Sequence, residues 1–187
     1  MNTKLSQMSA AALIFVLFTL LFGCSENSET PDAPAQPVLS DLNPSYEATL
    51  ADGIDFRKPG YPAFLAEVSG MSGQESWGRW TDANNGPVAK FRFKQPLPQK
   101  FTLEISADAL SPGQGKAILV RVGTVEKSFV VPKGSTGQAT YDLVFESTNG
   151  ADTLEIVPPK PASPASLNLS PDPRKLGVAM RSLKIRG

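Results

Sequence analysis

Apolar and polar residues alternate in short runs along the chain from about residue 60 onward. In residues 88–93, Phe91 and Phe93 fall on one face and Lys90 and Arg92 on the other, which is the period of a half-buried β-strand. Turn-forming residues separate these runs, and residues 46–187 contain no convincing amphipathic helix. We therefore predict an all-β fold, an antiparallel β-sandwich with a jelly-roll (galactose-binding-like) topology. About eight strands are expected, at residues 64–68, 88–93, 101–107, 117–122, 126–131, 139–145, 153–157 and 176–185.

Three details of the pattern refine this fold. The short break at residues 123–125 predicts a hairpin between two strands. Residues 158–164 are dense in proline and predict an extended surface connection rather than a linker between domains. In the last strand the alternation fails near Arg181 and Ser182, which predicts a β-bulge there.

The chain begins with a short polar lead and continues into an apolar run at residues 11–24. Crossing a bilayer takes about 20 apolar residues, so the run predicts a secretion signal rather than a spanning helix. Leu21, Gly23 and Cys24 match the lipobox of bacterial lipoproteins, which predicts a signal peptide over residues 1–23 and acylation, including palmitate, of Cys24. An ordinary secretory signal with an incidental thiol is the alternative.

Residues 24–45 are rich in proline and polar side chains and poor in apolar ones, so they predict a disordered tether from the lipid. Residues 46–187 are long enough for a single domain with its own core. Ser25 follows the cysteine, a sorting pattern that favours the outer membrane. The expected location is the cell envelope, with the domain anchored by lipid and facing the periplasm.

The composition excludes several classes of function. The 18 basic and 18 acidic residues cancel, and without a basic block the chain has no electrostatic reason to bind nucleic acid. There is no histidine, and the one cysteine is assigned to lipid, so the commonest zinc ligands and the commonest general base are missing. We expect no disulfide, no metal site, no cofactor and no catalytic residue.

Side-chain chemistry is most concentrated in one stretch, in which we take five residues as candidate carbohydrate contacts: Glu75, Trp77, Arg79, Trp80 and Asp82. In an extended strand Glu75, Trp77 and Arg79 would share one face and Trp80 would lie on the other. One tryptophan would then belong to the core, and the other would be exposed to stack on a sugar ring while Arg79 or Glu75 bonds its hydroxyls. The alternative is that both tryptophans are buried and Arg79 pairs with an acid to hold the loop.

The remaining candidate functional residues give weaker signals. Glu75 and Asp82 invite a glycosidase hypothesis, but two acids seven positions apart are common in turns. Ser72, Ser76 and Thr81 lack a histidine to activate them as nucleophiles. Nearer the end of the chain, Arg174 and Lys175 are candidates for contact with a phosphate or sugar acid, with a solvated loop as the alternative.

Six blocks of the sequence carry a resemblance to a known family: residues 68–72, 75–81, 95–103, 120–123, 151–161 and 173–178. In these blocks the chain resembles the C-terminal periplasmic domain of phosphoglycerol transferase I, the membrane enzyme that adds phosphoglycerol to osmoregulated periplasmic glucans. The catalytic domain of that family has metal-bound histidines and carboxylates and a threonine nucleophile, and none of these has a counterpart here. The resemblance therefore implies an accessory domain without the activity.

The residues and the resemblance together predict a non-catalytic, lipid-anchored envelope domain that binds periplasmic glucan or another envelope carbohydrate. The alternative is a protein-interaction module that docks onto a membrane-bound, glucan-modifying enzyme of the phosphoglycerol transferase type.

Overall fold

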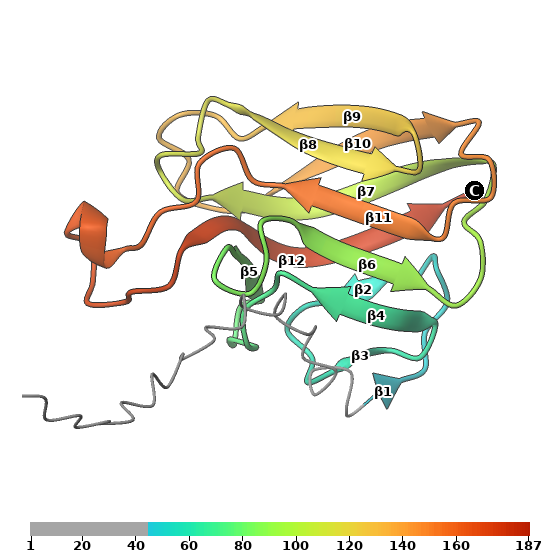
Figure 1. The fold of residues 1–187 in the computed structure, drawn as a ribbon, viewed down its shortest axis with the longest axis horizontal. Helices are drawn as coiled ribbons and strands as arrows, with labels where there is room; N and C mark the ends of the chain where they lie inside the picture. The colour runs from blue at the N-terminus through green and yellow to red at the C-terminus, as the bar shows by residue number, and fades with distance from the viewer. Residues whose placement is uncertain (1–44) are drawn as a thin grey trace, which may run out of the picture. The chain divides into compact units, whose positions relative to one another are not determined.

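The computed structural model describes residues 45–187, and these residues are almost entirely β-strand (Figure 1). The predicted signal peptide, Cys24 and nearly all of the predicted tether lie outside the described residues. One short 3-10 helix, η2 (Ala165–Leu167), interrupts the strands. The strands are β1 (Ser45–Tyr46), β2 (Ile54–Asp55), β3 (Tyr61–Pro62), β4 (Leu65–Ser69), β5 (Arg79–Asp82), β6 (Ala89–Phe93), β7 (Lys100–Ala109), β8 (Ala117–Val122), β9 (Val125–Val130), β10 (Ala139–Glu146), β11 (Thr153–Val157) and β12 (Leu176–Arg186).

Two five-stranded antiparallel sheets make up the sandwich (Figure 1). The first has the order β10-β7-β12-β2, with β5 also paired to β12, and the second has the order β4-β6-β11-β8-β9. Strands β5 to β12 follow the jelly-roll order, in which every connection except the β8–β9 hairpin crosses between the sheets and β5-β12-β7-β10 faces β6-β11-β8-β9. The predicted all-β jelly-roll sandwich is confirmed, with β4 added at one edge and β1 and β3 forming a separate parallel pair.

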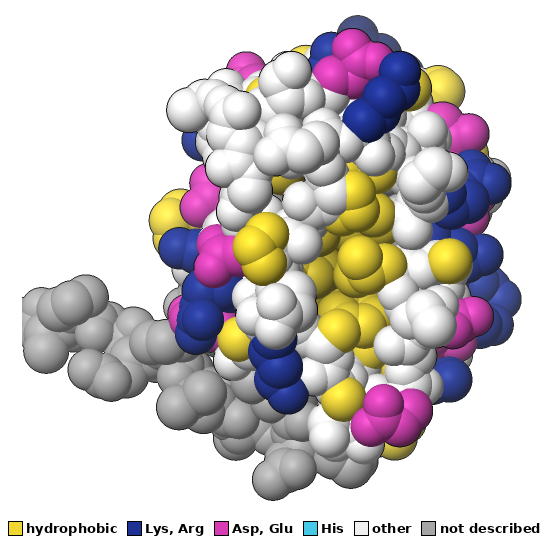
Figure 2. All heavy atoms as spheres, turned by 90° about the vertical axis from the view of Figure 1, so that its right-hand side faces the viewer, with side chains coloured by type: hydrophobic (Ala, Val, Ile, Leu, Met, Phe, Trp, Pro, Cys, Tyr) yellow, Lys and Arg dark blue, Asp and Glu magenta, His cyan; other side chains and the backbone are white. Residues whose placement is uncertain are grey.

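The alternation seen in the sequence becomes the alternation between the core and the surface. In β7, Leu103, Ile105 and Ala107 are fully buried between the sheets, and the residues between them face away from the core. Burial of each larger side chain, such as Leu103 or Ile105, contributes about 1.5–3 kcal/mol to stability. The inward face of the sheet is therefore the main source of stability. Figure 2 shows one end of the sandwich, where hydrophobic side chains are visible in the middle and charged ones lie around the rim.

Strand β12 contains the predicted bulge. Its pairing with β7 runs in register to Met180, resumes at Ser182, and leaves Arg181 as the extra residue. On its other edge, β12 pairs with β5 before the bulge and with β2 after it.

The two predicted connections are also confirmed. Val122 pairs with Val125, so a two-residue turn joins β8 and β9, and Gly123 adopts the left-handed φ of 57° that such a turn requires. The strand on the far side of the turn begins at Val125, one residue earlier than expected. Residues 158–175 form a long surface connection that contains η2 and is tied to the start of β12 by backbone hydrogen bonds between Ala162 and Leu176.

Candidate functional site

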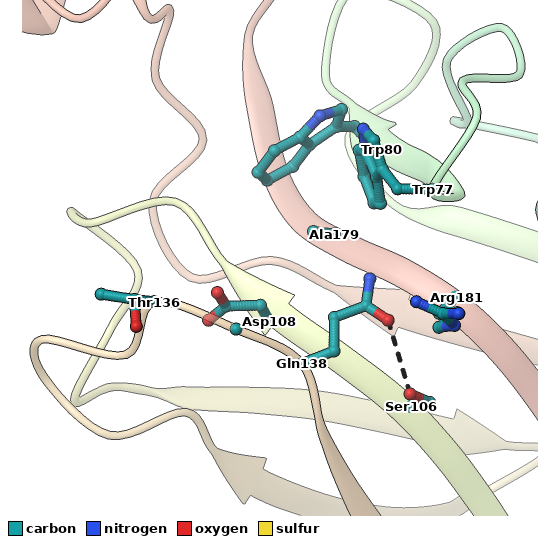
Figure 3. Close-up of a pocket in the computed structure, with 9 residues that line it drawn as sticks. Trp77, Trp80, Ser106, Asp108, Thr136, Gln138, Ala179 and Arg181 are labelled. Carbon is teal, nitrogen blue, oxygen red and sulfur yellow. Dashed lines mark hydrogen bonds between the residues drawn. The ribbon is translucent and has the colours of Figure 1, made fainter.

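An open cavity of about 540 Å³ lies on the outer face of the first sheet (Figure 3). Its lining comes from β5 and the turn before it, from β7, from β12 and from the loop that precedes β10. Figure 3 shows the two indoles on one side of Ala179 and the polar side chains of Asp108 and Gln138 on the other. The lining residues are Trp77, Trp80, Ser106, Asp108, Thr136, Gly137, Gln138, Ala179 and Arg181.

Strand register sets the floor of the cavity. Ala179 of β12 pairs with Trp80 of β5 on one side and with Asp108 of β7 on the other. These three positions therefore form a row across adjacent strands, on the face away from the core. Because Ala179 has a small side chain, the surface is hollow between the larger side chains of Trp80 and Asp108.

The β-bulge supplies a cation to the same cavity. As the extra residue of β12, Arg181 has no register partner on β7, although its carbonyl oxygen accepts the backbone N–H of Phe56 at 3.0 Å. Its side chain is exposed beside Gln138 (Figure 3). Among residues 45–187, Arg181 takes part in none of the ion pairs. Its five guanidinium N–H donors are thus available to a ligand.

A tight turn presents Trp77. The backbone N–H of Glu75 donates to the carbonyl oxygen of Gly78 at 2.8 Å, and the reverse bond measures 3.2 Å. The indole Nε1–H of Trp77 donates to Glu75 Oε2 at 2.8 Å. This bond and the turn place the Trp77 ring edge-to-face with Trp80, with 5.3 Å between the ring centroids and an interplanar angle of 74°.

Arg174 holds this turn from outside the cavity. Its Nη2 donates to Glu75 Oε1 at 3.1 Å and to Asp172 Oδ2 at 2.7 Å. The hydrogen bonds from Arg174 lower the pKa of the Asp172 carboxyl, and the bonds to Asp172 and Glu75 raise the pKa of Arg174. Lys175 is exposed, and its backbone N–H donates to Asn84 Oδ1 at 2.8 Å. Neither of these two bases lines the cavity.

Arg79 and Asp82, two of the predicted sugar contacts, are interior side chains. Each is only 3% exposed. The Arg79 guanidinium lies over the Tyr61 ring, 4.6 Å from its centroid, and donates to the carbonyl oxygen of Ser72 at 3.3 Å. Asp82 accepts the backbone N–H of Asn84 at 3.0 Å. Both side chains therefore hold the segment from within and do not face the cavity.

The expected extended stretch is wrong in one respect that matters for the site. The chain turns at Glu75–Gly78 and becomes strand only at Arg79, so Trp77 and Trp80 do not alternate between core and surface. Both indoles are half-buried and line the same cavity. The structure thus brings together Trp77, Trp80 and, through hydrogen bonds, Glu75 and Arg174.

Five polar lining residues were not predicted as site residues: Ser106, Asp108, Thr136, Gln138 and Arg181. They come from three segments that only the fold brings together. A weak signal existed in β7, where Ser106 and Asp108 occupy the outward positions of a strand with a buried opposite face.

Two features are absent from the part of the chain that the structure describes. Within residues 45–187, no group of three or more His, Cys, Asp or Glu side chains is arranged to hold a metal ion. No helix in this range has the length and hydrophobicity needed to cross a membrane.

Comparisons with known proteins agree on one relationship. A family model described as "Domain of unknown function (DUF7024)" matches residues 40–187. Phosphoglycerol transferase I from Escherichia coli O139:H28 (strain E24377A / ETEC), from E. coli O157:H7 (strain EC4115 / EHEC) and from Shigella boydii serotype 18 (strain CDC 3083-94 / BS512) is in each case 42% identical over 136 residues.

The match covers 72% of this chain and 17% of each relative, so the chain is similar to less than a fifth of their length. The matched region is the C-terminal part of the relatives, and the resemblance inferred from the sequence is confirmed. No solved structure matches the chain.

Proposed function

We propose that this chain, which belongs to the DUF7024 family of domains of unknown function, is a non-catalytic domain that binds carbohydrate. The carbohydrate would be a glucan or another envelope sugar. One observation carries the proposal: Trp77 and Trp80 line a single open cavity together with polar side chains. Flat apolar rings stack on the apolar faces of sugar rings, and a few placed polar groups give such a site its orientation and specificity.

The polar lining suits the hydroxyl groups of a sugar. Asp108 accepts hydrogen bonds, Arg181 donates them, and the Gln138 amide does both. A volume of about 540 Å³ lies in the range of small-molecule sites and accommodates one or two sugar rings. In this arrangement Glu75 and Arg174 position Trp77, while Arg79 and Asp82 support the segment from the interior.

The same lining argues against hydrolysis. A glycosidase needs two carboxyl groups about 5–9.5 Å apart on either side of the bond. Asp108 is the only carboxylate among the lining residues of this cavity. Of the two acids considered from the sequence, Asp82 is buried and Glu75 is bonded to Trp77 and Arg174.

The test is a titration of the full chain with purified periplasmic glucans, with and without phosphoglycerol groups, followed by tryptophan fluorescence and calorimetry. We expect saturable binding with an indole shift, lost in Trp77→Ala and Trp80→Ala variants that keep their circular dichroism. Asp108→Asn should weaken binding by about tenfold, because the loss of one hydrogen bond to a charged group lowers affinity by about that factor. Asp142→Asn, a matched change on the same sheet face but outside the cavity, should not.

A flat titration, or equal affinities for the Asp108→Asn and Asp142→Asn variants, would exclude the cavity as a sugar site.

We also propose that the chain is anchored to the cell envelope through acylated Cys24, with the domain in the periplasm and the outer membrane as its favoured location. The support is the lipobox pattern at residues 21–24. Labelling with a palmitate analogue should mark the parent chain and leave Cys24→Ser unmarked. Fractionation of the envelope on a density gradient should place the labelled chain with outer-membrane markers.

A second candidate function is docking onto a glucan-modifying membrane enzyme. It is favoured by the relatives, in which the matched region is 17% of a larger protein named as a transferase. Crosslinking in whole cells should then recover such an enzyme with this chain. Recovery that survives Trp77→Ala would separate docking from sugar binding.

A further inference from the structure

Three lysines from three loops gather at one end of the sandwich. Lys116 lies between β7 and β8, Lys133 between β9 and β10, and Lys160 between β11 and β12. All three loops lie at the left-hand end of the sandwich in Figure 1. None of the loops, residues 111–116, 131–138 and 158–164, contains an aspartate or a glutamate.

Hydrogen bonds tie the first two loops together. The backbone N–H of Gly115 donates to the carbonyl oxygen of Val131 at 2.7 Å. The Gln114 side chain accepts the N–H of Gly134 at 2.9 Å and donates to the carbonyl oxygen of Ser135 at 2.9 Å. Lys116 and Lys133 are therefore carried on backbone that is fixed by the same set of bonds.

The side chain of Lys133 runs across Gly115. A Cβ built on Gly115 would lie 2.7 Å from Lys133 Cγ and 2.8 Å from its Cε, and φ of Gly115 is +73°. Glycine thus leaves room for the lysine stem to lie against the backbone next to Lys116. The third loop joins them where Pro159, next to Lys160, lies 3.8 Å from a Cβ built on Gly113.

The other two lysines affect the ammonium group of Lys116. Desolvation and the neighbouring positive charge of Lys160, with a contribution from Lys133, lower the pKa of Lys116. Among the described residues, none of the three takes part in an ion pair with an acid. A cluster of like charges without a counter-charge is unfavourable alone and is relieved by a bound anion.

We propose that Lys116, Lys133 and Lys160 form a binding site for a phosphate group, as an ester free in solution or as the headgroup of an anionic lipid. Each ammonium offers three donors, and a phosphate group presents several acceptor oxygens, so one phosphate can be shared by three lysines. The site does not depend on the proposed sugar site. The loop that carries Lys133 also supplies Thr136, Gly137 and Gln138 to the cavity.

The test uses the full chain with its lysines labelled for NMR, titrated separately with inorganic phosphate and with glycerol phosphate. We expect saturable shifts at the three lysines and a rise in the pKa of Lys116, because a bound phosphate favours the charged ammonium. A second arm measures binding to phosphatidylglycerol vesicles, with phosphatidylcholine vesicles as the baseline.

Two matched triple variants make the result specific, because each removes three positive charges from exposed or half-exposed positions. The cluster variant should bind at least about tenfold more weakly than the parent, and the control variant should stay within about twofold. The cluster variant is Lys116→Gln, Lys133→Gln and Lys160→Gln, and the control is Lys90→Gln, Lys94→Gln and Lys127→Gln.

Saturation with glycerol phosphate in solution assigns the site to a soluble ester. Cluster-dependent binding to phosphatidylglycerol vesicles alone assigns it to a lipid headgroup. Equal losses in the two variants would show a net-charge effect and overturn the proposal, as would no saturable binding in either arm.

Discussion

Replacing Gly78 by alanine tests whether the turn that carries Trp77 is held against β12. Gly78 has a φ of +156°, and a Cβ built on it would lie 2.2 Å from the carbonyl oxygen of Met180. The obstacle is backbone in the middle of the sheet and not the end of a flexible side chain. The Gly78→Ala variant would therefore need β5, with Trp80, to move away from β12.

The size of the effect follows from these contacts. A Cβ essentially never lies closer than 3.0 Å to another heavy atom, so the backbone must move by about 1 Å. Overpacking of this kind costs about 1–3 kcal/mol, and an unfavourable φ costs about as much again. We expect Gly78→Ala to lower the free energy of unfolding by about 2–5 kcal/mol out of a total of about 5–15 kcal/mol. The melting temperature should fall by roughly 5–15 °C.

Gly73→Ala is the matched control, because Gly73 lies five residues earlier in the same segment and has no left-handed φ. Apart from its own residue and its two chain neighbours, its Cβ would lie more than 4 Å from any heavy atom. It should change the free energy of unfolding by no more than about 0.5–1 kcal/mol, with a gain favoured because alanine restricts the unfolded chain. Urea unfolding of the full chain, followed by tryptophan fluorescence and circular dichroism, measures both variants. Equal stability of the two variants would refute the close approach of the turn to β12.

Three further predictions concern the hydrogen bonds of Arg174 and Asp172 and the buried core. Arg174→Gln should cost only about 0.5–1 kcal/mol of stability, because the ion pair with Glu75 is partly exposed, yet it should weaken sugar binding and shift Trp77 emission; unchanged emission would exclude its positioning role. Phe91→Ala should cost about 3–5 kcal/mol in urea unfolding, because the ring is fully buried; a loss under about 1 kcal/mol would contradict this. The pKa of Asp172 is lowered in the folded state, so the contribution of this carboxylate to stability is present above about pH 4 and is lost as pH falls through the folded pKa. Asp172→Asn should flatten that part of the profile of unfolding free energy against pH, and an unaltered profile would exclude this contribution.

The fold was largely predictable because a single physical rule governs it. Strands such as β7 bury every second side chain, and this period is visible without any knowledge of partners. The bulge at Arg181 was also visible, because one extra residue shifts the phase of the pattern.

The site was only half predictable. Two tryptophans and two acids in one stretch indicated where to look, but the extended interpretation of that stretch could not anticipate the turn at Glu75–Gly78. Arg79 was expected to bond sugar hydroxyls, with holding the loop as the alternative, whereas the Tyr61 ring and backbone carbonyls accommodate its charge in the interior. Gln138 is brought to the cavity by strand order, which no local pattern encodes.

The edge of the first sheet consists of two short strands, β2 and β5, that meet β12 on either side of its bulge. The chain between them, residues 56–78, leaves the sheet, forms β3 and β4, and returns with the turn that holds Trp77. An edge assembled in two pieces offers no long run of unpaired backbone groups, so it resists edge-to-edge association with other chains. The same division leaves the turn that holds Trp77 outside the ladder of β12, so a change in the turn need not shift the register of the sandwich strands.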